Sequence, residues 1–334
     1  MFFLASIVHG RRHPGGPRSA RTDTGKDVVD DALLRIIRCP VTGARLRVRD
    51  EVLVGGGREY PVRDGIPILL QDPHQRPEQD PGPVAALEEQ IMDAFEDRSA
   101  SYFSDNYLST SPASQDRRRR HELVVGLLRG VIAPEAAVLE AGSGPAVLAG
   151  EIAALGGRYV AADLSYHNLI AARERLGSVR GVVGNLTELP FASESFDVVA
   201  AIGCLEYVPA MGRAVNELSR VCRKGGVIIA SFANRNSPRR WWEELLVHRA
   251  ARIRAHRSGA SVYRRFLVSP ATVRRVFEAA GAPVRDEQPL NGGLVGFPLS
   301  GFRIIQRAEA ALQARSSRAR LASSEFVVVA ERRA

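Results

Sequence analysis

The chain of 334 residues is short of cysteine, of long apolar runs and of lysine. Its three cysteines, Cys39, Cys204 and Cys222, are scattered, which argues against a disulfide framework and makes the cytoplasm the expected compartment. No apolar run approaches the roughly 18 residues that a membrane-spanning helix needs. The opening MFFLASIV is short and follows no basic residues, so it predicts neither a signal peptide nor an anchor. Residues 1–27 are expected to be disordered.

Lysine occurs only at positions 26 and 224, so nearly all of the 46 basic residues are arginine. This bias is typical of a GC-rich coding sequence, and it weakens the inference from a net charge of +9 to a nucleic-acid partner. Residues 235–265 nevertheless combine nine arginines with Trp241 and Trp242. They predict either a solvated cap helix whose tryptophans pack on the core, or a surface for RNA, a membrane or an acidic substrate. The arginines at 117–120 are expected on the exposed face of a helix.

Residues 137–164 have the pattern of a buried strand, a glycine turn, a helix and a second strand that ends in an acid. Glu140, Gly142 and Gly144 form an E-x-G-x-G turn, and Asp163 follows Gly144 by 19 residues. Glycines at such a turn let a ligand approach bare backbone. A carboxylate about 20 residues further on is suited to a pair of ribose hydroxyls. The segment therefore predicts a site for a nucleotide-type cofactor.

Two residues of this turn discriminate between cofactors. A dinucleotide fingerprint has a third glycine where this chain has Val147. The acid Glu140 suits a ligand with a positive amino group better than it suits a pyrophosphate. Both observations favour S-adenosylmethionine (SAM) over NAD.

The strand-and-helix pattern then continues to the end of the chain. Strands are expected at 179–184, 196–202, 227–231 and 325–331, and helices at 211–222 and from 270 to about 280. The motifs LPF, SFDVV, LEYV and RKGG follow in order, and with them residues 100–235 resemble class I SAM-dependent methyltransferases of the small-molecule, methyltransferase type 11 kind. More loosely, the resemblance extends to the C-terminus. It implies an α/β fold with a Rossmann-like core of seven strands.

The resemblance also implies roles for individual residues. The acid and glycines of the turn would meet the methionine part of SAM, Asp163 the ribose, and the residues after the next strands the adenine. Asn185 stands where the family usually has Asp, and its amide oxygen would accept the adenine amino group. The implied cofactor residues are Glu140, Gly142, Gly144, Asp163, Leu164, Asn185 and Leu186, with Tyr102, or else Tyr107, closing over SAM.

Catalytic residues are less clearly indicated. A general base is needed only if the acceptor is protonated, and Glu206 at the end of the fourth strand is the nearest candidate. Tyr207 stands where the family often has His. His121 and His167 are further candidates, and no metal is expected.

Residues 28–70 form a second recognisable unit, with a hairpin at residues 55–57 and the ending YPVRDGIPILL. They resemble the small zinc-ribbon domain that occurs as a methyltransferase activator subunit. A zinc ribbon needs paired cysteines, but here only Cys39 is present and Thr42 stands at the partner position. We therefore expect a metal-free domain, then a linker over 71–84 and a methyltransferase domain over 85–334 with a cap insert at about 235–268.

Together these features predict a cytoplasmic enzyme that transfers a methyl group to O, N or C of a small or amphipathic metabolite. An rRNA or tRNA methyltransferase is the alternative that the domain pairing and the positive charge favour. It is weakened because residues 203–206 lack the N/D-P-P-Y/F motif of many base N-methyltransferases. An inactive SAM-binding scaffold is a third hypothesis, and peripheral contact with a membrane stays open.

Overall fold

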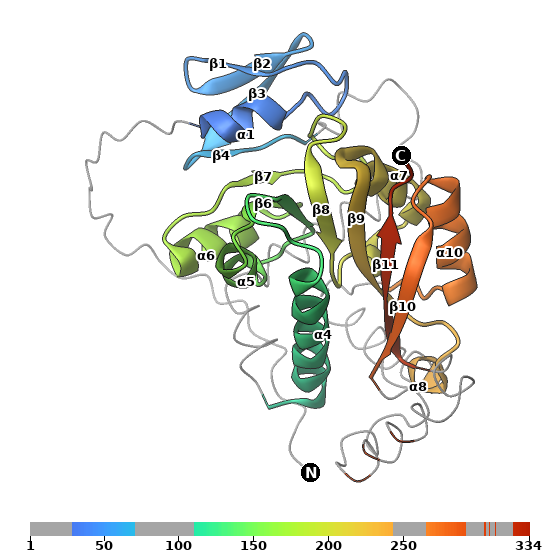
Figure 1. Ribbon diagram of the computed structural model, residues 1–334. Helices are drawn as coiled ribbons and strands as arrows, with labels where there is room; N and C mark the ends of the chain where they lie inside the picture. The colour runs from blue at the N-terminus through green and yellow to red at the C-terminus, as the bar shows by residue number, and fades with distance from the viewer. Residues whose placement is uncertain are drawn as a thin grey trace, which may run out of the picture.

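The computed structural model describes residues 29–70, 110–242, 265–291 and 323–334, with the single positions 304, 307 and 311. Its centre is a seven-stranded sheet with the order β10-β11-β9-β8-β5-β6-β7 (Figure 1). Five parallel strands are followed by an antiparallel pair. The strands are β5 (Ala137–Ala141), β6 (Arg158–Asp163), β7 (Gly181–Val183), β8 (Phe196–Ala201), β9 (Cys222–Ala233), β10 (Val284–Leu290) and β11 (Glu325–Glu331). The predicted seven-stranded Rossmann-like core is confirmed.

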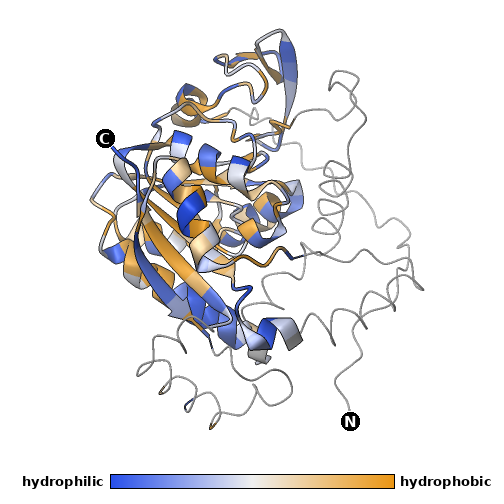
Figure 2. Cartoon of the chain, turned by 90° about the vertical axis from the view of Figure 1, so that its right-hand side faces the viewer, coloured by the Kyte–Doolittle hydropathy of each residue, from blue (hydrophilic) through white to orange (hydrophobic). Residues whose placement is uncertain are grey.

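Helices cover both faces of this sheet. The helices are α4 (Pro112–Arg129), α5 (Ala149–Ala154) and α6 (Tyr166–Leu176) on one face, and α7 (Met211–Val221) and α10 (Pro270–Ala279) on the other. Neighbouring residues of β5 pack in opposite directions, because Val138 joins the apolar cluster with Leu128 of α4 while Leu139 joins the cluster with Leu218 of α7. The central strands are accordingly mostly apolar and buried, as parallel strands between helices require, and they are orange in Figure 2.

The N-terminal part of the chain forms a separate small sheet. Its elements are α1 (Asp31–Ile36), β1 (Arg47–Arg49), β2 (Val52–Gly55), β3 (Arg58–Arg63) and β4 (Ile66–Pro67), and all its strands are antiparallel. Asp30 caps α1 by accepting hydrogen bonds from the N–H groups of Ala32 and Leu33. Gly56 and Gly57 both have positive φ angles, +61° and +74°, which a two-residue turn between β2 and β3 requires. The predicted hairpin and the predicted β-rich N-terminal unit are confirmed.

This N-terminal sheet docks on the β7 end of the large sheet, where Figure 1 shows β4 next to β7. Three backbone hydrogen bonds join the two parts: Leu69 N–H to Val183 O (2.8 Å), Arg38 N–H to Pro190 O (2.9 Å) and Ala192 N–H to Ile36 O (2.8 Å). Both ends of the segment 183–192 are therefore bonded to the N-terminal part. Apolar residues of the two parts also belong to one continuous buried cluster.

Two sequence expectations need correction. Of the arginines at 117–120, only Arg119 is exposed, while Arg120 is buried because its side chain turns toward β11. In the short helix α8 (Pro238–Trp242), Arg239 and Arg240 are buried, whereas Trp241 is 63% exposed. Trp241 therefore does not pack on the core. Residues 243–264, most of the expected cap insert, lie outside the described residues, as do Tyr102, Tyr107 and the linker. In the described part of the chain, no helix is long and apolar enough to cross a membrane.

Candidate active site

A pocket lies at the carboxyl ends of the parallel strands, where the loops after β5 and β8 diverge to opposite sides. Such a point is where open α/β sheets bind ligands. Every predicted cofactor residue within the described ranges lines this pocket, namely Glu140, Gly142, Gly144, Asp163, Leu164, Asn185 and Leu186. Of the two predicted catalytic residues, Tyr207 lines the pocket and Glu206 does not. Of the two further candidates, His121 lines it, while His167 is exposed outside it.

Glu140, on β5, is a buried carboxyl at the pocket wall and only 2% exposed. The hydroxyl of Tyr159 on β6 donates a hydrogen bond to its Oε2 at 2.5 Å. Burial raises the pKa of Glu140 to about 8, because the hydrogen bond from Tyr159 offsets only part of the desolvation and nearby Asp163 adds repulsion. At neutral pH this carboxyl therefore holds a proton for most of the time.

Asp163, at the end of β6, closes the glycine turn from the opposite side. Its Oδ2 accepts a hydrogen bond from Gly144 N–H at 2.7 Å, and its Oδ1 accepts bonds from Ser165 N–H at 3.0 Å and Asn168 Nδ2 at 3.1 Å. Burial raises the pKa of the carboxyl despite these donors. The side chain is thereby held in one orientation at the pocket edge.

The turn between β5 and α5 has an unusual backbone. Gly142 has a φ of +70°, and a Cβ there would lie 2.5 Å from the Cβ of Cys204. The glycine therefore allows the loop after β8 to approach, besides leaving the backbone open to a ligand. Ala146 has a φ of +55°, in the left-handed region that glycine prefers. This conformation is a physical reason why a glycine suits this position.

Asn185 and Leu186 follow β7 and form the far end of the pocket. The Oδ1 of Asn185 accepts hydrogen bonds from Thr187 N–H at 3.0 Å and from Thr187 Oγ1 at 2.9 Å. The amide oxygen is thus used within its own turn, and the remaining polar group of the side chain is the Nδ2 donor. This geometry does not favour the predicted acceptance of a hydrogen bond from an amino group.

Glu206 and Tyr207 belong to a short 3-10 helix, η3 (Leu205–Tyr207), after β8. The Glu206 carboxylate is 4% exposed and lies 3.5 Å from Nε of Arg265. The same Nε donates a hydrogen bond to the hydroxyl of Tyr207 at 3.0 Å. Among the described residues, Glu206 is thus linked to the lining residue Tyr207 through Arg265, a residue that the sequence alone did not single out.

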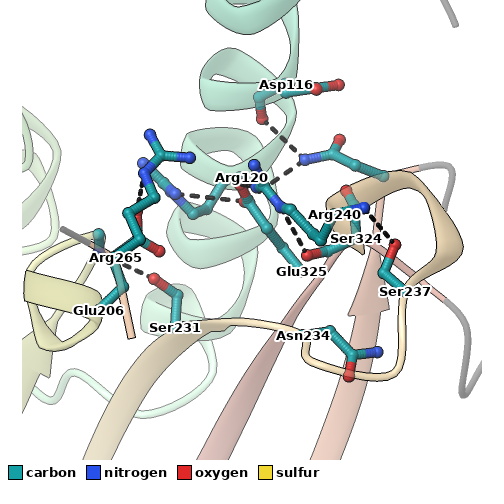
Figure 3. Close-up of polar contacts among 12 residues, drawn as sticks. Asp116, Arg120, Glu206, Ser231, Asn234, Ser237, Arg240, Arg265, Ser324 and Glu325 are labelled. Carbon is teal, nitrogen blue, oxygen red and sulfur yellow. Dashed lines mark hydrogen bonds and ion pairs between the residues drawn. The ribbon is translucent and has the colours of Figure 1, made fainter. Parts of the chain in front are cut away.

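An ion-pair cluster continues behind this wall (Figure 3). Arg120 of α4 donates to Glu325 Oε2 at 3.2 Å, and Arg240 of α8 pairs with Glu325 Oε1 at 2.5 Å. Burial opposes ionisation of Glu325, but Arg120 and Arg240 hold the pKa of its carboxyl below the usual range. Arg239 pairs in the same way with Asp116 of α4 at 2.6 Å.

Three side chains from one face of α4 reach the pocket: Arg117, Arg120 and His121. Their spacing of three and four residues is the signal in the sequence that could have identified them, since it places them together on a helix. His121 also lies 2.9 Å from Glu151 of α5. The basic side chains of the pocket thus come from α4, and its acidic side chains come from β5 and β6.

No group of three His, Cys, Asp or Glu side chains that could hold a metal occurs among residues for which the structure gives positions. Cys39 is buried, and its sulfur lies 3.1 Å from the hydroxyl of Tyr60. Thr42, at the position of the missing second cysteine, donates its N–H to the same sulfur at 3.4 Å.

Comparisons with known proteins agree with this geometry. Residues 139–230 match a family model described as a methyltransferase domain. The chain is 37% identical over 191 residues to a demethylmenaquinone methyltransferase from Mycobacterium sp. (strain KMS), covering 54% of this chain and 81% of the relative. It is also 37% identical over 117 residues to a probable SAM-dependent methyltransferase of Mycolicibacterium smegmatis, covering 35% of this chain and 45% of that protein.

Two solved structures share the fold, each with a TM-score of 0.51. One is a complex of the Haloferax volcanii Trm112 methyltransferase activator with a methyltransferase, 18% identical and covering 72% of this chain and 98% of that one. The other is the Synechocystis magnesium protoporphyrin IX methyltransferase with bound S-adenosylhomocysteine (SAH), 14% identical and covering 73% and 99%.

The fold and the pocket, taken with these similarities, define a class I methyltransferase. The chain belongs to the SAM-dependent methyltransferases of the small-molecule type, and SAM is its methyl donor.

Proposed function

We propose that this enzyme methylates O, N or C of a small, amphipathic metabolite, and that the acceptor is an aromatic quinol with an apolar tail. The observation that carries the proposal is the extension of the pocket beyond the predicted cofactor residues. There it is lined by Ile202, Gly203, Tyr207, Val208 and Pro209. This wall is mainly apolar with one phenol, and the Arg120 guanidinium borders it, which suits a flat ring with few polar groups. The name of the mycobacterial relatives gives demethylmenaquinone as their acceptor, and the reduced, hydroquinone form of that compound belongs to this class.

The residues present fit SAM. The acid Glu140 is available to a positive amino group, Asp163 to ribose hydroxyls, and the apolar Leu164 and Leu186 to the faces of an adenine. We do not assign Asn185 Oδ1 as the acceptor for the adenine amino group, because that oxygen already accepts two hydrogen bonds from Thr187. When bound, SAM supplies a methyl group that is already activated by its sulfonium.

The chain's own residues then align the acceptor and exclude water. Tyr207 contributes its hydroxyl at the pocket wall, held by Arg265. Glu206 acts as a positioning residue for Arg265, since its carboxylate does not line the pocket. We propose this role in place of the general base that the sequence indicated for Glu206.

We further propose that residues 28–70 are a metal-free relative of the zinc-ribbon activator domains, fused to the methyltransferase domain of 85–334. The hairpin, the single Cys39 and the docking on residues 183–192 support this assignment. A solved neighbour contains a methyltransferase with a Trm112 activator, so the pairing of two such units has a counterpart there.

The test is methyl transfer from labelled SAM to a prenylated 1,4-naphthoquinol, to an organic extract of the source cells and to total RNA. Label in the quinol, or in one compound of the extract, is expected. The matched control is Asp163→Ala, which should lose the transfer together with SAM binding. Label at one defined position in RNA would replace the metabolite proposal with the RNA alternative. Binding of SAM without any transfer would favour the scaffold hypothesis.

RNA is the less favoured acceptor because of where the described arginines of residues 235–265 lie. Arg239, Arg240 and Arg265 are paired with acids inside the protein. Side chains used in this way do not contact phosphates, and contacts to phosphates are what a basic nucleic-acid surface supplies. Only Arg235 is exposed among the arginines of this segment whose positions the structure gives.

A further inference from the structure

The charged groups of the pocket are separated in space. Glu140 and Asp163 come from β5 and β6, whereas Arg120 comes from α4. A Cβ placed on Gly203, just after β8, would lie 2.7 Å from Nη2 of Arg120. Because β8 and β6 flank β5 on opposite sides, the Arg120 guanidinium lies on the side away from Asp163 and Asn185. It therefore borders the part of the pocket that we assign to the acceptor.

Arg120 is fixed in this position from behind. Its side chain is 9% exposed, and Nη1 donates to Glu325, which Arg240 also holds (Figure 3). A guanidinium stays protonated at every pH that a protein tolerates, and the low pKa of Glu325 keeps the partner ionised as well. The pocket wall thus presents a permanent positive charge that is oriented before any ligand arrives.

Tyr207 is held in the same manner on the neighbouring part of the wall. Arg265 donates to its hydroxyl, and the Arg265 guanidinium carbon lies 5.7 Å from the centre of the Tyr207 ring. Arg120 and Tyr207 both line the pocket, so a ligand atom near the end of β8 meets a cation and a phenol. Glu325 and Arg240 lie behind Arg120. Arg265 and Glu206 lie behind Tyr207.

Arginine side chains are concentrated around this wall. Among the described residues, the ion pairs of this cluster join five arginines, at 119, 120, 239, 240 and 265, with three carboxylates, at 116, 206 and 325. Glu140, on the other side of the pocket, is largely protonated at neutral pH in the ligand-free protein, and once the cofactor's amino group ionises it, those two charges balance each other. A concave site with an oriented cation favours an anionic ligand group.

We propose that the methyl acceptor is a compound with an acidic hydroxyl, such as a phenol, a hydroquinone or an enol, which binds as its oxyanion against Arg120 and beside Tyr207. This inference rests on the proposed function, and it adds the ionisation state and the binding residue. Binding the acceptor already ionised agrees with the absence of Glu206 from the pocket wall, because an oxyanion needs no base. Negative charge on oxygen also makes that oxygen, or a ring carbon conjugated with it, a better nucleophile. The new bond to the methyl group forms as the S–CH3 bond of SAM breaks and SAH leaves, and a methylated ring carbon then loses its proton to water.

The test uses the full-length protein saturated with SAH and two coloured probes, 4-nitrophenol and its neutral methyl ether 4-nitroanisole. The wild-type protein should bind the phenolate at least tenfold more tightly than the ether. It should also lower the apparent pKa of the bound phenol by about one unit, read from the absorbance of the anion. Arg120→Gln should lose both effects. Arg119→Gln, an exposed neighbour on the same helix, should retain them.

Arg120→Gln leaves Glu325 short of a buried partner, so that variant can fail to fold. The double variant Arg120→Gln with Glu325→Gln removes both charges and should show the same loss of preference for the phenolate. The affinity for SAH, measured by calorimetry, serves as the check on folding and should change less than twofold.

Two results would overturn the inference. One is equal binding of phenol and ether by the wild-type protein. The other is a loss of SAH affinity in the variants as large as the loss for the phenolate, which would assign Arg120 to the methionine carboxylate of SAM. A phenolate preference that depends on Arg120, without methyl transfer to the prenylated quinol, would uphold this inference and reject the proposed acceptor.

Discussion

Replacement of Glu140 by Gln should change how the stability of the ligand-free protein depends on pH. Burial raises the pKa of this carboxyl to about 8 in the folded protein, from an ordinary value of 4.5. Between these two pH values the folded state holds a proton that the unfolded chain has released. The contribution of Glu140 to stability is therefore complete below pH 4.5 and is lost as the pH rises to about 8.

The size of the expected stability difference follows from the difference between the pKa of Glu140 in the folded and in the unfolded protein. A pKa difference of one unit corresponds to about 1.4 kcal/mol, so ionisation of Glu140 would lower the free energy of unfolding by about 5 kcal/mol at most. Glutamine removes the titration, while its amide oxygen can still accept the hydrogen bond from Tyr159. The variant should therefore become progressively more stable than the wild-type protein between pH 5 and pH 8.

Urea denaturation at each pH, without SAM, measures this difference directly. Glu122→Gln is the matched control, because Glu122 is exposed on α4 and its replacement should leave the slope unchanged. Curves for the wild type and Glu140→Gln that run parallel from pH 5 to pH 8 would refute the reasoning. Calorimetry adds a second readout: a positive ligand group beside Glu140 should release its proton, so SAM binding should liberate protons in the wild type and not in the variant.

Three further predictions concern cofactor binding, metal content and the glycine turn. Asp163→Ala should weaken SAM binding at least tenfold in calorimetry, because each lost charge-assisted hydrogen bond contributes about 1.5–3 kcal/mol, and an unchanged dissociation constant would remove Asp163 from the site. Elemental analysis should find less than one zinc per chain, and a chelator should leave the melting temperature unchanged; one tightly bound zinc would show that Cys39 has partners after all. Gly142→Ala should lower the melting temperature by several degrees, since its Cβ would contact Cys204 and its φ is +70°. Gly126→Ala, in an open stretch of α4, should instead stabilise the protein by about 0.5–1 kcal/mol, and equal effects of the two changes would contradict the steric argument.

The sequence predicted those parts of the site that depend on short spacing. The turn of Glu140, Gly142 and Gly144 and the acid at Asp163 belong to one strand–helix–strand unit, so their meeting in the pocket follows from local geometry. The final strand was predicted with the same bounds as β11, because an apolar run of valines is a strong strand signal.

The part of the pocket that we assign to the methyl acceptor could not be predicted from short sequence spacing. Arg120 pairs with Glu325 across 205 positions of sequence, and a run of four arginines gives no sign that one member turns inward. The surroundings of Glu206 depend on Arg265, which contacts the neighbouring Tyr207 across 58 positions of sequence. Even over two residues, the sequence did not predict the partner of Asn185. Its amide oxygen accepts a hydrogen bond from Thr187 because of the conformation of the turn, which the residue type alone does not reveal.

The docking of the N-terminal sheet has a consequence for self-association. β7 is the last strand of the large sheet, and a strand in that place usually offers unpaired N–H and C=O groups to strands of other molecules. Here Leu69 and Ile68 of the same chain pair with Val183, so that part of the border is already occupied. Apolar groups such as Phe191 are covered at the same time. A chain shortened to begin after residue 70 would expose both the open backbone and this apolar surface, and would aggregate where the intact protein does not.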